Sequence, residues 1–113
     1  MKTASLKDNV EFLENKPGVT LMMETKTSKE VRIALRKDQV MKKHQTKFPI
    51  TVEIFEGAID FGVNGETLVL ERGDLISLDE NVPHDLLAKE DSIVRLTLSL
   101  SDSEKRVEEV ASK

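Results

Sequence analysis

Three consecutive stretches of the chain carry the pattern of β-strands, and a turn signal joins two of them. Residues 50–56, 58–63 and 67–70 are rich in apolar and β-branched side chains, which in a strand point alternately to opposite faces. Asn64-Gly65 lies between the second and third stretches and favours a two-residue hairpin turn, because both central residues of that turn need positive φ. The sequence therefore predicts an antiparallel hairpin in the middle of the chain.

Further strands are predicted on both sides of this hairpin. Apolar and polar residues alternate along residues 30–36 and 93–100, as in strands with one buried face. Shorter strands are predicted at residues 19–24, 39–43 and 75–78. Because short strands follow one another without an intervening helix, an all-β sandwich or barrel is favoured over a parallel α/β sheet.

The C-terminal stretch has a different period. Ser101 and Glu104 fit a capping box, and Val107, Val110 and Ala111 share one face of a helix. We therefore expect a short C-terminal helix at about residues 102–111, acting as a surface lid or an interface element.

Length and composition limit the classes of protein. The 113 residues suit one domain, 1–113, with a core at about residues 18–100 and an N-terminal edge segment at 1–17. A net charge of −4 does not favour nucleic acid as a partner, and the absence of cysteine excludes disulfides and thiolate sites. Without a secretory signal or a stretch of membrane-spanning length, we expect a cytoplasmic protein with no membrane contact.

The only two histidines, His44 and His84, fall on two motifs that are typical of the cupin superfamily. The first motif runs glycine, five residues, H-x-H, three or four residues, glutamate, six residues, glycine. Counted back from Gly57, it places His44 on its first histidine. The second runs glycine, five residues, P-x-G, two residues, histidine, three residues, asparagine, and from Gly73 it places His84 on its histidine. Residues 18–100 thus resemble a small cupin, which implies a double-stranded β-helix, or jelly-roll barrel.

Two kinds of departure from the motifs bear on the turns and on the metal site. Asp38 and Asn81 stand where the family has glycine, and both residue types tolerate left-handed turn geometry, so the turns can survive. Thr46 and Ile50 replace two of the family's four metal ligands. A threonine hydroxyl is a poor ligand and isoleucine is none, so the resemblance implies an incomplete metal site.

The resemblance also implies a pocket inside the barrel mouth. Its polar groups and walls would be His44, Thr46, Ile50, Val52, Phe61, His84 and Leu86. Neutral imidazoles suit zinc, nickel, iron or copper, so His44 and His84 are the candidate metal ligands. Strand alternation sends Glu53 and Asp85 to the other face, which leaves no evident third ligand. In the alternative without metal, the histidines bond to water or to each other.

Three functions stay open at this point. The first is a small stand-alone cupin that binds a small molecule in the barrel, similar to ligand-binding domains related to arabinose-type regulators. The second is a metal-dependent enzyme of the isomerase or dioxygenase type that uses His44 and His84, and the third is a structural protein with a filled barrel. The sequence leaves enzymatic activity undecided. Because family members of this size often pair, the resemblance also implies a homodimer.

Overall fold

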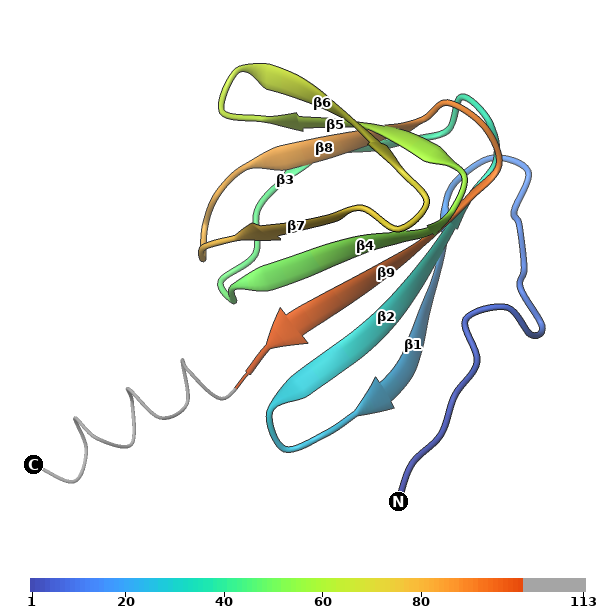
Figure 1. Cartoon of the computed structure of the whole chain (residues 1–113), viewed down its shortest axis with the longest axis vertical. Coiled ribbons are helices and arrows are strands. Elements are labelled where there is room, and N and C mark those ends of the chain that lie inside the picture. Colours follow the sequence, from blue (N-terminus) through green and yellow to red (C-terminus); the bar gives the residue numbers. More distant parts are fainter. Residues whose placement is uncertain (101–113) are drawn as a thin grey trace, which may run out of the picture.

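The structure, a computed structural model, describes residues 1–100, so the helix predicted at residues 102–111 lies outside the described residues. Residues 1–100 form strands and loops only (Figure 1), and they contain no helix that could cross a membrane. The strands are β1 (Gly18–Glu24), β2 (Ser28–Leu35), β3 (Val40–His44), β4 (Ile50–Glu56), β5 (Ala58–Val63), β6 (Glu66–Glu71), β7 (Leu75–Leu78), β8 (His84–Ala88) and β9 (Ser92–Ser99).

The strands form two antiparallel sheets that face each other (Figure 1). The five-stranded sheet has the order β1-β2-β9-β4-β7, and the four-stranded sheet has the order β3-β8-β5-β6. Chain neighbours often lie in different sheets, as in a jelly roll, where the chain crosses repeatedly between the two layers. The all-β jelly-roll fold predicted from the sequence is confirmed.

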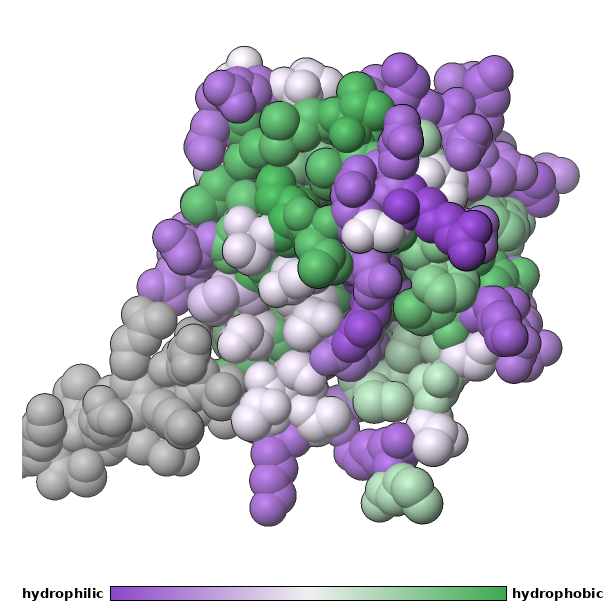
Figure 2. All heavy atoms as spheres, viewed as in Figure 1, coloured by the Kyte–Doolittle hydropathy of each residue, from purple (hydrophilic) through white to green (hydrophobic). Residues whose placement is uncertain are grey.

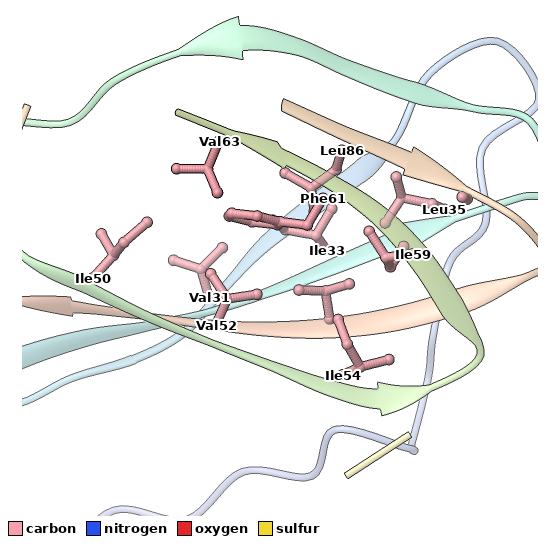
Figure 3. Close-up of a cluster of buried hydrophobic side chains, with 12 residues drawn as sticks. Val31, Ile33, Leu35, Ile50, Val52, Ile54, Ile59, Phe61, Val63 and Leu86 are labelled. Atoms are coloured by element: carbon pink, nitrogen blue, oxygen red, sulfur yellow. The ribbon is translucent and has the colours of Figure 1, made fainter. Parts of the chain in front are cut away.

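The core lies between the two sheets and is built by strand alternation. Figure 3 shows the inward-pointing side chains of both sheets meeting in one cluster. Each such aliphatic or aromatic side chain contributes about 1.5–3 kcal/mol when fully buried. The buried members are Val31, Ile33, Leu35, Ile50, Val52, Ile54, Ile59, Phe61, Val63, Leu86, Ala88 and Val94.

The core reaches the surface on the side where β6 and β7 form the edges of their sheets. Leu68, Leu70, Ile76 and Leu78 pack against the core but are only half-buried. Figure 2 shows apolar side chains gathered over these strands and their neighbour β5. The sandwich is therefore less completely covered at this edge than at its centre.

The turns adopt the conformations that their residue types predict. Asn64 and Gly65 have φ of 53° and 76°, which confirms the hairpin turn between β5 and β6. Asp38 and Asn81, which replace the glycines of the cupin motifs, have φ of 74° and 64°. Both positions thus keep a left-handed backbone without glycine.

One strand was not predicted from the sequence. β8 (His84–Ala88) pairs with β3 on one side and β5 on the other, although no strand was assigned to this range. The strand is short and follows Pro83. Only three of its residues, His84, Leu86 and Ala88, point into the core, which is too few to give a clear alternating pattern. Its two partners, which are far away in the sequence, stabilise it as the second strand of the four-stranded sheet.

The N-terminal segment is held against the five-stranded sheet by a buried arginine. Arg32 on β2 is only 5% exposed. Its guanidinium donates hydrogen bonds to the backbone carbonyls of Ser5 at 3.3 Å, Asp8 at 2.9 Å and Asn9 at 3.1 Å. A buried cation needs such partners, so these bonds fix the segment on the outer face of β2.

Candidate functional site

The structure brings His44 and His84 together inside the barrel. His44 is the last residue of β3 and His84 the first of β8, and the two are paired across the strands. Their ring centroids lie 4.3 Å apart with an angle of 57° between the ring planes. Two strand ends that are distant in the sequence therefore place two imidazoles in contact.

Both rings are held by the same kind of hydrogen bond. Nδ1 of His44 lies 2.9 Å from the carbonyl oxygen of Lys42, and Nδ1 of His84 lies 3.0 Å from that of Val82. A carbonyl oxygen can only accept, so Nδ1 is the donor in each ring, and Nε2 of the neutral ring keeps its lone pair. Metal-binding histidines are commonly oriented in this way, with one ring nitrogen on a backbone carbonyl and the other free.

The environment of His84 favours its neutral form. The side chain is only 2% exposed, and this burial lowers the pKa of His84 below its ordinary value. The hydrogen bond to Val82 raises the pKa, nearby His44 lowers it and Asp85 raises it, but burial is the largest effect. A neutral imidazole with a free Nε2 is a competent ligand for a transition metal at neutral pH.

Apolar side chains fill most of the space around the histidines. The Phe61 ring stacks on His84 with centroids 5.6 Å apart and ring planes within 8°. Val52, Leu86 and both histidines line a cavity of about 10 Å³, and Ile50 is buried in the core with Phe61. Such a cavity has room for about one water molecule, whereas sites for organic ligands are commonly 300–1,000 Å³.

Three of the seven predicted pocket residues do not line this cavity: Ile50 and Phe61 are buried in the core, and Thr46 lies in the loop after β3. Thr46 follows β3, and its hydroxyl donates a 2.7 Å hydrogen bond to the carbonyl of Phe48. Its side chain is therefore engaged in the local loop and does not line the cavity beside the histidines.

Four lining residues were not nominated from the sequence. Ile33, Met41, Val94 and Leu96 complete the wall of the cavity. Strand alternation marked three of them as inward-facing, on β2 and β9. What the pattern could not indicate is that these two strands lie opposite the histidines.

The nearby carboxylates point away from the barrel interior, as strand alternation predicts. Glu53 lies on the outer face of the five-stranded sheet, where its Oε1 is 3.6 Å from Nη1 of Arg95. Asp85 lies on the outer face of the four-stranded sheet, paired with Gly62. Within residues 1–100, no group of three or more histidine, cysteine, aspartate or glutamate side chains is arranged to hold a metal ion.

Solved structures with the same architecture place this fold among known proteins. A jelly roll whose paired histidines lie at the ends of β3 and β8 defines a small double-stranded β-helix protein. An RmlC-like cupin from Desulfovibrio desulfuricans is similar with a TM-score of 0.81 and 22% identity, over 88% of this chain and 96% of that one.

Two further structures support the same class. A protein with a double-stranded β-helix domain from Klebsiella pneumoniae has a TM-score of 0.76 and 17% identity, over 88% and 89% of the two chains. KdgF from Halomonas sp. has a TM-score of 0.72 and 22% identity, over 77% and 81%. No family model and no curated protein matches the sequence. The chain has the fold of the cupin superfamily.

Proposed function

We propose that this chain is a small binding cupin whose site is the pair His44 and His84. The pair is an incomplete metal site, in which two imidazoles supply nitrogen ligands and a bound small molecule or water supplies the others. Zinc, nickel, iron and copper suit such donors. The relation to domains of arabinose-type regulators and the cytoplasmic location stay predictions.

The observation that carries this proposal is the orientation of the two rings. Both Nδ1 atoms are engaged by backbone carbonyls, which leaves two Nε2 lone pairs on rings 4.3 Å apart. A cation or a hydrogen-bond donor is what two such acceptors bind. Nothing else in the barrel interior has comparable polar chemistry among the residues that the structure describes, because the surrounding wall is apolar.

The size of the cavity limits where an organic ligand would lie. A volume of about 10 Å³ beside the rings leaves no room for a sugar or an organic acid deeper in the barrel. We therefore place such a ligand at the mouth, next to the half-buried His44. Exposed Lys42, Lys43 and Lys47 near that strand end favour an anionic molecule.

A second candidate function is supported by the same cavity. A barrel filled by Val52, Phe61, Leu86 and their neighbours is also what a purely structural protein would show. The metal-dependent enzyme of the isomerase or dioxygenase type has less support. Iron oxygenases that hold their metal through two histidines use a carboxylate as the third ligand, and the nearby Glu53 and Asp85 face outward.

Metal titration of protein purified without an affinity tag separates these candidates. We expect one equivalent of Ni²⁺ or Zn²⁺ to bind by calorimetry, and His44→Ala and His84→Ala each to weaken it at least about tenfold. Thr46→Ala is the matched control and should leave the affinity unchanged, because its hydroxyl is engaged by Phe48.

Two outcomes would contradict the proposal. If neither Ni²⁺ nor Zn²⁺ binds at millimolar concentration, and a thermal-shift screen of sugars and organic acids also gives no stabilisation, the filled structural barrel is the correct function. If metal binds equally well to both histidine variants, the metal site lies elsewhere in the chain.

A further inference from the structure

A hollow lies between the N-terminal segment and the five-stranded sheet, away from the two histidines. Its volume is about 250 Å³, and it is bordered by Ala4 and Leu6 of the segment and by Met22 and Met23 of β1. Figure 1 shows the segment, in dark blue, beside the edge strand β1. Because Arg32 binds three backbone carbonyls of the segment, this wall of the hollow is held in place by the sheet itself.

Two consecutive methionines border the same hollow because β1 contains a bulge. The register between β1 and β2 shifts between Leu21 and Met23, so Met22 is an extra residue that opposes no residue of β2. In a regular strand, successive side chains point to opposite faces. The bulge interrupts this alternation, and Met22 and Met23 both line the hollow. Their thioether side chains are flexible and adapt to apolar molecules of different shape.

An ion pair forms a polar side of the hollow. Nε of Arg95 on β9 donates a 3.2 Å hydrogen bond to Oε1 of Glu30 on β2, and both residues line the hollow. Burial raises the pKa of Glu30, but hydrogen bonds from Thr97, Ser28 and Arg95 outweigh this effect and hold the pKa below its ordinary value. Nη1 of Arg95 lies 3.6 Å from Oε1 of Glu53. The guanidinium is therefore held between two carboxylates in a fixed orientation.

These contacts decide which polar group a ligand would bring. Within residues 1–100, the Nη2 amino group of Arg95 has no hydrogen-bond partner, so it remains a donor for a ligand. Glu30 already accepts three hydrogen bonds, so a cationic ligand would have to displace one of them. An anionic ligand would meet the charges of both Glu30 and Glu53. A neutral molecule with an acceptor oxygen fits this combination.

We propose that the hollow is a binding site for a compact, neutral molecule with an apolar body and one carbonyl or hydroxyl oxygen. The body lies against Leu6, Met22 and Met23, and the oxygen accepts a hydrogen bond from Nη2 of Arg95. A volume of about 250 Å³ is below the roughly 300–1,000 Å³ of common ligand sites, which limits the ligand to about the size of a six-membered ring. The site is independent of the histidine pair, which lies between the two sheets.

Nuclear magnetic resonance of methyl-labelled methionine tests the location, because the four methionines report on different places. Met22 and Met23 border the hollow, Met41 lines the cavity beside the histidines, and Met1 is exposed. Titration with cyclohexanone should shift the signals of Met22 and Met23 and saturate in the millimolar range, which is usual for so small a molecule. The signals of Met1 and Met41 should stay in place. Shifts that do not saturate, or a saturating shift of Met41 alone, overturn the proposal.

Two charged molecules with the same ring test the chemistry of the ligand. Cyclohexanecarboxylate and cyclohexylammonium should each bind at least about tenfold more weakly than cyclohexanone, because the first meets Glu30 and Glu53 and the second meets Arg95. Equal affinity for the ketone and for either ion would contradict the assignment of a neutral ligand.

Replacing the arginine tests the hydrogen bond to the ligand. Arg95→Met should weaken the binding of cyclohexanone at least about tenfold, because it removes the donor at Nη2. Arg72→Met is the matched control, because Arg72 is exposed in the turn between β6 and β7 and does not border the hollow. The Met41 signal of each variant reports whether the barrel is intact. If Arg95→Met binds cyclohexanone as tightly as wild type does, the oxygen does not lie at Arg95 and the proposal is wrong.

Discussion

Replacing His84 by leucine tests whether the buried ring is neutral in the folded protein. The ring is 2% exposed and donates one hydrogen bond, from Nδ1 to the carbonyl of Val82. Leucine removes this bond and the titrating group, with little change in volume. At pH 8 the lost hydrogen bond should lower the free energy of unfolding by about 1 kcal/mol.

The effect of pH follows from the lowered pKa of His84. In the unfolded chain this histidine binds a proton near pH 6.5, whereas the folded chain binds it only at lower pH. The unfolded state therefore holds more protons below pH 6.5, and wild-type stability falls as the pH decreases through that range. If the folded ring stays neutral, the loss reaches about 1.4 kcal/mol at pH 5.5, and His84→Leu avoids it.

Urea unfolding at pH 8 and pH 5.5 measures both effects. The free energy of unfolding of His84→Leu should lie below that of wild type at pH 8, and this difference should shrink or vanish at pH 5.5. Leu86→Met is the matched control, since Leu86 is 4% exposed on the same strand and does not titrate, so its effect should be the same at both pH values. An identical deficit of His84→Leu at the two pH values would refute the neutral, buried ring.

Three further predictions concern the scaffold. Phe61→Ala should cost about 3–5 kcal/mol in urea unfolding, because this fully buried ring fills the centre of the core, and a cost near that of a surface substitution would contradict the packing. Gly57→Ala should cost more free energy of unfolding than Gly73→Ala, for which we expect only the roughly 1–2 kcal/mol of left-handed strain, because only at Gly57 would the new Cβ clash with Ser92; equal losses would exclude that clash. Arg32→Met should increase hydrogen exchange and proteolysis in the N-terminal segment, whose carbonyls it holds, and unchanged protection there would show that other contacts fix the segment.

The local features of the fold followed from the residues themselves. Asn64-Gly65 predicted a turn because few residue pairs accept positive φ at two successive positions, and the structure has that turn. The alternation of Ile50, Val52 and Ile54 predicted the buried face of β4 for an equally local reason. The β8 strand was not predicted, because its stability comes from pairing with β3 and β5 and not from the short alternation of apolar residues within it.

The candidate site was only partly visible in the sequence. Motif spacing nominated His44 and His84, and the structure pairs them. Thr46 was nominated by the same spacing, but its hydroxyl binds the carbonyl of Phe48, a contact that depends on the path of the loop. Met41 was left out because one methionine carries no signal of its position in a barrel, although it lines the cavity.

By itself, the sequence determined the all-β class, the turns and the face of its strand on which most side chains lie. These properties depend on residues within a few positions of one another. Only the tertiary structure decided the volume beside His44 and His84 and the hydrogen bonds that leave both Nε2 atoms free. It also decided which side chains lie beside one another on the outer face of the four-stranded sheet. These properties depend on strand register and on packing between two sheets, where side chains distant in the chain compete for the same space.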